Sequence, residues 1–283
     1  MEAQQAVLSP SGSDAESIAT LGWIMFGGGS AIFFGVVGLA AYALLGGERP
    51  RRYLASRSFV VVAGVLFPAA TLTALLAYGL ILTGARVAAP EVGALRIEIT
   101  GEQWWWRVRY PGGADAAPMV TANEIRIPIG RQVEIRLASA DVIHSFWVPN
   151  LAGKVDMIPG TVNRIRLRAT RAGTYRGQCA EYCGGPHALM AFYVVALEPA
   201  QFEDWLAAQR GPAAKPLTPT QMQGEGLFLS TGCGGCHAIR GTPAAGTIGP
   251  DLTHVGGRLS LPAPTMPRTP TSFPPWAPHN QHT

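Results

Sequence analysis

Ala94-Leu-Arg-Ile-Glu-Ile-Thr100 alternates apolar and polar side chains, and this alternation decides how the middle of the 283-residue chain folds. A period of two puts every second side chain on the same face of a β-strand, so that one face is buried and the other is solvated. The alternation returns in segments that begin at Asn123, Val133 and Val162, with turn-forming residues between them. These short strands predict an all-β sandwich or barrel, which a helix after Glu198 closes, so that the domain covers residues 94–210.

Two long uncharged stretches lie upstream of these strands. Residues 21–45 and 58–84 contain no charged side chain, and each would form a helix roughly 38 Å long, enough to cross a hydrocarbon core of about 30 Å. Helices of soluble proteins seldom run so far without a charge, which disfavours a buried pair of soluble helices. We expect a transmembrane hairpin over residues 21–84, with helices at about 21–46 and 58–83.

The loop between the two stretches sets the expected orientation. Residues 47–57 contain four arginines and one glutamate, and the positive-inside rule places such a loop in the cytoplasm. Both chain ends then face the periplasm of a bacterial inner membrane, which the chain crosses more than once. We expect residues 1–20 to form a polar periplasmic tail, because residues 1–17 lack the basic and apolar regions of a signal peptide.

A series of metal-binding residue types lies in Cys179-Ala-Glu-Tyr-Cys183-Gly-Gly-Pro-His187-Ala-Leu-Met190. Thiolates and thioethers are soft ligands that suit copper, whereas methionine is not among the usual ligands of zinc. A disulfide between the two cysteines would leave the rest of the series unexplained. Another histidine, His144, precedes Cys179 by 35 residues. Two thiolates that each bridge two metals, with one imidazole per metal, would make a compact binuclear copper centre that moves electrons.

Three motifs make the chain similar to subunit II of the haem–copper cytochrome c oxidases over roughly residues 18–206. They are Gln103-Trp-Trp-Trp106, Asp141-Val-Ile-His-Ser145 and the series from Cys179 to Met190. The resemblance implies a cupredoxin-like Greek-key barrel whose loops hold the family's binuclear CuA centre at one end. It places the copper ligands at His144, Cys179, Glu181, Cys183, His187 and Met190.

The resemblance also gives each ligand a role. The two cysteines would bridge both coppers, and His144 and His187 would bind one copper each. Met190 would be a weak axial ligand on one copper, and the backbone carbonyl of Glu181 would serve the other. Family members carry a magnesium ion at the border with subunit I, which the Glu181 side chain would reach. Packing of Met190 in the core is the alternative reading of that residue.

A second cofactor motif, Cys233-Gly-Gly-Cys236-His237, follows a proline-rich linker at residues 211–219 and an expected helix at 220–230. C-x-x-C-H is the attachment signature of c-type haem, in which two thioethers fix the porphyrin and the histidine binds iron. A zinc knuckle or a redox dithiol is the alternative. Because Gly249-Pro250 is similar to a turn of cytochromes c, residues 220–283 resemble the small helical cytochrome c domain fused to subunit II in one branch of the oxidases.

The end of this expected domain departs from that pattern. A cytochrome c domain continues to a methionine ligand and a closing helix, but residues 262–276 are too rich in proline for a helix. Met266 is the only methionine after His237 and is the expected sixth haem ligand, with alternatives at His254, His279 and His282. The domain is therefore either abbreviated or incomplete.

The tryptophan run Trp104-Trp105-Trp106 is expected on a strand, with Trp104 and Trp106 on one face and Trp105 on the other. The resemblance implies that Trp104 is the surface point where electrons from cytochrome c enter; core packing is the alternative. Residues 94–198 carry nine acidic and twelve basic side chains, whereas capture of a basic soluble cytochrome calls for negative charge. We therefore expect the chain's own haem to be the immediate donor, held at high effective concentration by the short linker.

These expectations converge on an electron-transfer subunit of a cytochrome c oxidase, anchored in the lipid bilayer. Electrons would pass from cytochrome c through CuA to the haem and copper site of subunit I, with subunit III as a further partner. Six histidines are too few for an oxygen-reducing site on this chain, and a net charge of +4 gives no sign of nucleic-acid binding. The oxidoreductase activity and the proton translocation would belong to the complex.

Other functions account for fewer of the motifs. A freestanding membrane-anchored electron-transfer or copper-handling protein would share the anchor and the copper ligands. Nitrous-oxide reductase shares the ligand spacing but needs a large histidine-rich domain, and quinol oxidases lack the copper ligands. Val61 stands where many relatives of the oxidase family carry a glutamate at the mouth of a proton path, so the usual residue for proton uptake is absent from this position.

Overall fold

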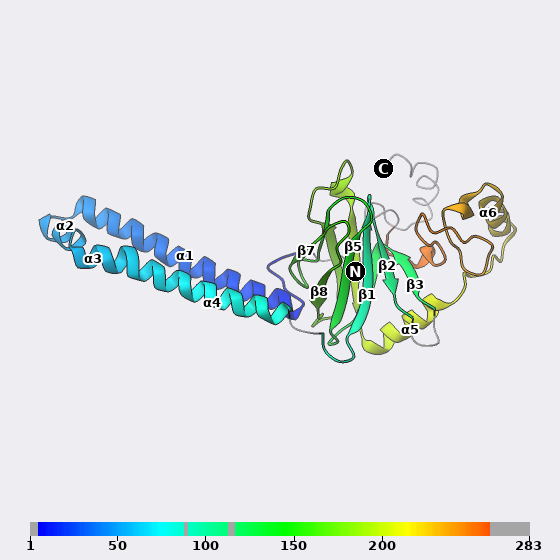
Figure 1. Cartoon of the computed structure of the whole chain (residues 1–283), viewed down its shortest axis with the longest axis horizontal. Coiled ribbons are helices and arrows are strands. Elements are labelled where there is room, and N and C mark those ends of the chain that lie inside the picture. The colour runs from blue at the N-terminus through cyan, green and yellow to red at the C-terminus, as the bar shows by residue number, and fades with distance from the viewer. Residues whose placement is uncertain (1–4, 88–89, 113–116, 261–283) are drawn as a thin grey trace. The chain divides into compact units, whose positions relative to one another are not determined.

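The computed structural model describes residues 5–87, 90–112 and 117–260 (Figure 1). The chain forms two compact units, one of residues 17–89 and one of the residues on either side of that range. The first unit is helical, and the second is built around β-sheets. Met266, His279, His282 and the proline-rich tail lie outside the described residues.

The helical unit contains the two expected apolar helices. Helix α1 covers Ser13–Leu45, the short helix α2 covers Glu48–Leu54, and α3 covers Arg57–Val61. A π-helical turn over Val62–Leu66 then leads into α4, Phe67–Val87. Ser13–Leu45 and Arg57–Gly84 are each long and apolar enough to cross a membrane.

Helix α1 begins eight residues before the expected start at residue 21. Apolar character marks the part of a helix that suits lipid, whereas the start of a helix depends on its first turn. Asp14 and Glu16 lie in that turn, where carboxylates interact favourably with the positive end of the helix dipole. Residues 13–20 are therefore helical rather than part of an extended tail. Residues 47–57, expected as a loop, contain helix α2.

The π-helical turn lies directly before Pro68, the second residue of α4. Proline has no N–H, and in a regular α-helix its ring would clash with the carbonyl four residues earlier. A π turn widens the helix over those residues and is one of the recognised ways in which helices accommodate such a position. The second apolar helix thus remains continuous through its proline.

The β unit is a sandwich of two five-stranded sheets, which confirms the expected β domain. The first sheet has the order β3-β2-β1-β5-β8, with bounds Met119–Ala122, Trp105–Tyr110, Leu95–Glu102, Val133–Ser139 and Asn163–Leu167. The second has the order β4-β10-β9-β6-β7, with bounds Glu124–Pro128, Ala191–Leu197, Gly173–Cys179, His144–Trp147 and Lys154–Met157. Strands β1 and β5 are parallel, as are β4 and β10, so both sheets are mixed.

Aromatic side chains from both sheets form the centre of the core. Trp106 of β2 is fully buried, and its ring lies 4.8 Å from that of Phe192 on β10 and 6.0 Å from that of Phe146 on β6. Phe146 and Phe192 stack with a centroid distance of 4.7 Å. Aromatic contacts of this kind add to the stabilisation from burial. They anchor β6 and the β9–β10 pair, which carry the metal-binding residue types.

Gly177 on β9 provides the space for this aromatic cluster. A Cβ atom at position 177 would overlap the ring of Phe192, whereas one at Gly173 on the same strand would come no closer than 3.4 Å to the Tyr175 hydroxyl. We expect Gly177→Ala to lower the free energy of unfolding by about 1–3 kcal/mol through overpacking. Urea unfolding followed by tryptophan fluorescence measures this change. Gly173→Ala is the matched control, and equal stability of the two variants would contradict the prediction.

Two helices follow the sandwich. Helix α5 covers Pro199–Arg210 and buries Phe202 and Leu206 against it, as the sequence predicted. Helix α6 covers Pro219–Ser230 and begins with a capping box in which Thr218 and Gln221 bond each other's backbone. The described residues after α6 form two short 3₁₀ turns, at Cys233–Gly235 and Val255–Gly257, and an isolated β-bridge between Ala238 and Ala245.

Candidate metal centre

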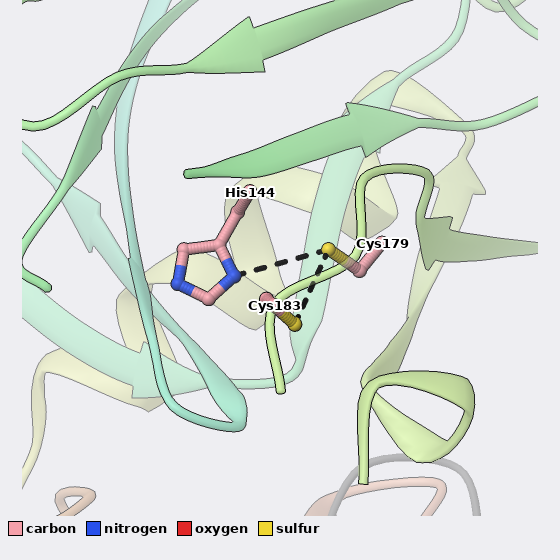
Figure 2. A group of neighbouring side chains, drawn as sticks. All are labelled: His144, Cys179 and Cys183. Carbon is pink, nitrogen blue, oxygen red and sulfur yellow. Dashed lines mark hydrogen bonds between the residues drawn. The ribbon is translucent and has the colours of Figure 1, made fainter. Parts of the chain in front are cut away.

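The cysteine series lies where strand β9 ends. Cys179 is the last residue of β9, and the loop to β10 carries Cys183, His187 and Met190. His144 is the first residue of β6. Because Phe146 of β6 pairs with Cys179, the sheet brings His144 to the cysteine loop across 35 residues of sequence. Figure 2 shows the imidazole of His144 pointing toward the two thiols.

The side-chain donor atoms converge within hydrogen-bond range of the two sulfurs. Cys179 Sγ lies 3.9 Å from Cys183 Sγ and 3.8 Å from His144 Nδ1. Cys183 Sγ lies 3.4 Å from His187 Nδ1 and 3.7 Å from Met190 Sδ. The backbone carbonyl of Glu181 faces Cys179 Sγ at 3.2 Å. All six residues predicted as metal ligands are therefore brought to one place.

The geometry of the sulfurs suits metal binding rather than a disulfide. A disulfide bond is about 2.05 Å long, whereas these sulfurs are 3.9 Å apart and both cysteines are free. A typical metal–thiolate bond is about 2.3 Å long, which is more than half of the 3.9 Å between the two sulfurs. One metal ion can therefore bond to both thiolates at once. Cys179, Cys183, His144 and Met190 are all buried, which shields such an ion from water. The Glu181 residue is exposed.

The two thiols differ in acidity because their surroundings differ. Burial alone would raise the pKa of Cys179, but its hydrogen bonds with His144 and with backbone groups outweigh burial and hold that pKa below its usual range. Burial raises the pKa of Cys183 to about 12, and repulsion from Cys179 contributes to the rise. Cys179 is thus the first of the pair to ionise, and a metal that binds both sulfurs displaces the proton of Cys183.

Asp141 holds the His144 ring in place. Its Oδ1 lies 2.8 Å from His144 Nε2, and its Oδ2 accepts the Gln103 N–H at 2.6 Å. Burial would raise the pKa of Asp141, but these hydrogen bonds outweigh it and lower that pKa. An ionised carboxylate only accepts hydrogen bonds, so His144 Nε2 donates a proton to Asp141, and Nδ1 is the nitrogen that faces the thiols. The sequence reasoning assigned Asp141 no role, although a carboxylate three residues from a ligand is a known signal for one.

Trp104 lies beside the cysteine loop, but not on a strand as predicted. Strand β2 begins at Trp105, and Gln103 and Trp104 form the turn that joins it to β1. The Trp104 indole N–H donates to the Cys183 carbonyl at 3.1 Å, and the Gln103 side-chain amide donates to the same oxygen at 2.8 Å. These long-range bonds take Trp104 out of the strand register. They also attach its ring directly to the backbone of a predicted metal ligand.

A separate group of predicted cofactor residues lies after α6. Cys233 and Cys236 are free and exposed, and His237 Nδ1 lies 2.8 Å from the Pro250 carbonyl. A carbonyl only accepts hydrogen bonds, so Nδ1 carries the proton and Nε2 is the nitrogen left for a metal. Gly249 makes room for this ring, because a Cβ there would lie 2.5 Å from His237 Cε1. The alternative ligand His254 instead places Nε2 3.2 Å from the Gly211 carbonyl.

Comparison with known proteins shows what the β unit resembles. Residues 95–197 match the family "Cytochrome C oxidase subunit II, periplasmic domain". Cytochrome c oxidase subunit 2 of Alkalihalophilus pseudofirmus is 39% identical over 171 residues, which cover 60% of this chain and 48% of that protein. The subunit 2 of Thermostichus vulcanus is 38% identical over 137 residues, covering 47% of this chain and 40% of that protein. The chain thus spans about half the length of these relatives.

Among solved structures, the periplasmic domain of subunit II of cytochrome oxidase from Bradyrhizobium japonicum is 29% identical to the matched part of this chain. The match covers 44% of this chain and 96% of that domain, with a TM-score of 0.40. The match of residues 95–197 to the family and the identities with its named members agree with one another. The β unit of this chain is therefore similar to the periplasmic domain of cytochrome c oxidase subunit II.

Proposed function

We propose that this chain is the electron-transfer subunit II of a bacterial cytochrome c oxidase. It takes electrons from cytochrome c, first of all from a haem c on its own C-terminal segment, and passes them through a binuclear CuA centre to the oxygen-reducing site of subunit I. The observation that carries this proposal is the convergence of two thiols, two imidazole nitrogens, a thioether and a carbonyl around Cys179 and Cys183.

The donor set fits copper in each of its parts. Cys179 and Cys183 would supply the two thiolates, and His144 and His187 would each offer Nδ1 to copper. Met190 and the Glu181 carbonyl complete the set as weak ligands. Copper bound by these residues would supply one-electron transfer with little rearrangement of its ligands. The protein's part is to hold these atoms in a buried, rigid loop, which the stacked core behind β6 and β10 supports.

The C-terminal segment fits a covalently attached haem. Cys233 and Cys236 offer two exposed thiols, and His237 offers Nε2 to iron. No residue of α6 is buried, and apolar side chains near the motif face solvent, among them Met222, Leu227 and Ile248. Exposed apolar patches of this kind usually mark a surface that something covers. A haem attached at the motif is the apolar group that would cover it, with Met266 as the proposed sixth ligand.

The remaining assignments place the chain in its complex. The two apolar helices anchor it in the bacterial inner membrane, with the copper and haem sites on the periplasmic side. Subunits I and III are its proposed partners, and the exposed Glu181 side chain is the proposed magnesium ligand at the border with subunit I. Trp104, which bonds the Cys183 carbonyl, is the proposed point where electrons enter from cytochrome c.

Spectroscopy of the purified full-length chain in detergent tests the proposal. We expect an electron paramagnetic resonance signal from one electron shared by two coppers, together with the optical bands of haem c. Co-purification provides a second test, because an oxidase subunit should stay bound to a large haem-containing membrane partner. A chain that carries both spectra but never binds such a partner would instead be a freestanding electron carrier.

Removal of the Asp141 carboxylate is expected to weaken copper binding. Asp141→Ala leaves the His144 ring without its Nε2 partner and the Gln103 N–H without an acceptor. Loss of such a supporting group typically costs about 10–100-fold in metal affinity. Competition with a copper chelator measures the change. Asp156→Ala, which removes an exposed carboxylate from β7, is the control for net charge, and equal affinities in the two variants would refute a supporting role.

A further inference from the structure

The residues that carry the haem motif make specific contacts with the β-sandwich. We call residues 231–260 the haem segment. Its attachment points on the sandwich are two charged side chains, Arg107 on β2 and Glu124 on β4. Arg107 pairs across the sheet with Ala122, two residues before Glu124, so both lie where β3 leads into β4. We call these two side chains the docking face.

Glu124 is the more unusual of the two because it is a buried carboxylate, with 6% of its surface exposed. Carboxylates are seldom buried unless they are paired and hydrogen-bonded. Glu124 Oε1 lies 2.8 Å from the Arg126 guanidinium, and Oε2 accepts the backbone N–H of Leu259 at 2.8 Å. A charge-assisted hydrogen bond in a buried position is strong and is poorly screened by salt. Among the described residues, the hydrogen bond to the second oxygen of Glu124 thus comes from the haem segment.

Arg107 connects the same segment to the tryptophan run. Its guanidinium pairs with Glu102 at 2.6 Å, lies 4.6 Å from the centre of the Trp105 ring, and donates to the Ile248 carbonyl at 3.1 Å. Ile248 is followed by Gly249 and Pro250, the residues against which the His237 ring rests. Residues 248–250 therefore contact both the predicted haem ligand His237 and, through Arg107, strand β2.

The linker is also bonded to the haem segment. The Ala213 N–H donates to the Arg240 carbonyl at 2.9 Å, and the Arg240 guanidinium donates to the Gln209 carbonyl at 2.5 Å. Next to the second attachment point, burial lowers the pKa of Arg258 to about 10, and attraction to Asp251 and Glu124 opposes this effect. Charged groups of the segment and of the sandwich thus share one buried neighbourhood. A freely moving module would not bury charges in this way.

We propose that Arg107 and Glu124 form a docking face that holds the haem segment in one fixed position on the sandwich. The occupant of this face is the segment of the same chain that carries Cys233, Cys236 and His237. The docking itself depends only on protein contacts, and its part in electron transfer rests on the proposed function. In that role the haem is a fixed neighbour of the copper site, and the docking adds to the high effective concentration expected from the short linker.

One backbone hydrogen bond provides the sharpest test. Leu259→Pro removes the N–H that Glu124 accepts and leaves every side chain of the sandwich unchanged. Arg258 has φ −75° and ψ 153°, which is the region that a residue before proline prefers. Leu259→Ala is the matched control, because it shortens the same exposed side chain and keeps the N–H.

Hydrogen exchange of the full-length chain in detergent is the readout. We expect amides of residues 231–258 to exchange about tenfold faster in Leu259→Pro than in wild type, because a charge-assisted bond has been lost, and to be unchanged in Leu259→Ala. In wild type this protection should persist at high salt, since Glu124 is buried. Equal protection in Leu259→Pro and Leu259→Ala would overturn the proposal.

A second pair of variants tests the other attachment point with a smaller risk of misfolding. Arg107→Met removes the bond to the Ile248 carbonyl, and Arg109→Met removes the next arginine on the same face of β2, which pairs with Glu98 instead. Faster exchange in Arg107→Met alone supports the docking face, and equal exchange in both variants opposes it. Copper and haem spectra are recorded on the same samples. Their absence would contradict the proposed function, while the exchange comparison would still decide the docking.

Discussion

Cys183→Ser is expected to eliminate the binuclear copper centre while leaving the haem. Cys183 Sγ is the atom nearest to three other donors, at 3.9 Å from Cys179 Sγ, 3.4 Å from His187 Nδ1 and 3.7 Å from Met190 Sδ. A serine hydroxyl is a hard donor that stays protonated at neutral pH, so it cannot bridge two soft metal ions. Copper content should fall from about two ions per chain to one or none, with loss of the shared-electron signal.

The same substitution at the other motif provides the control. Cys233→Ser removes one thioether link and should impair haem attachment; the Cys233 Sγ lies 3.4 Å from Thr231 Oγ1, a neighbour outside the copper loop. Metal analysis and optical spectra of the two variants should therefore show opposite losses. Retention of two coppers in Cys183→Ser would contradict the bridging role of this thiol.

The candidate metal site was largely predictable because most of its residues are close in sequence. Cys179 to Met190 lie in twelve consecutive positions, and the types of donor in them already point to a soft metal. His144 is different, because only the pairing of β6 with β9 brings it to the loop. Periodicity predicts that strands exist but not which strands pair, and so His144 was placed through the family resemblance.

The sequence was least informative where distant residues compete with a local pattern. Trp104 follows the alternation of a strand, yet its bond to the Cys183 carbonyl and the bond from Gln103 to Asp141 draw the chain into a turn. Glu124 reads as an ordinary solvated strand residue, but it is buried, and beside the nearby Arg126 it is the distant Leu259 N–H that bonds its carboxylate. In both cases the deciding partner lies at least 38 residues away, beyond the reach of any local period.

Gly249→Ala is expected to prevent His237 from binding haem iron, although the mutated residue donates no ligand. A Cβ at position 249 would lie 2.5 Å from Cε1 and 2.8 Å from Nδ1 of the His237 ring. Contacts below about 3 Å force the ring to move, and the Nδ1 bond to the Pro250 carbonyl, which orients Nε2, would be lost with it. The reduced optical spectrum should change from that of a six-coordinate haem c to that of a haem without a strong axial histidine.

Gly257→Ala is the matched control, because a Cβ at that position meets no atom within 4 Å. Both variants make the same change in the same segment, and both leave Cys233 and Cys236 able to form thioethers. Gly257→Ala should therefore keep the wild-type spectrum, and both variants should keep copper. If Gly249→Ala also kept the wild-type spectrum, the imidazole could not be seated between Gly249 and the Pro250 carbonyl when haem is bound. The iron would then need a different histidine, and His254, whose Nε2 lies 3.2 Å from the Gly211 carbonyl, would be the residue to replace next.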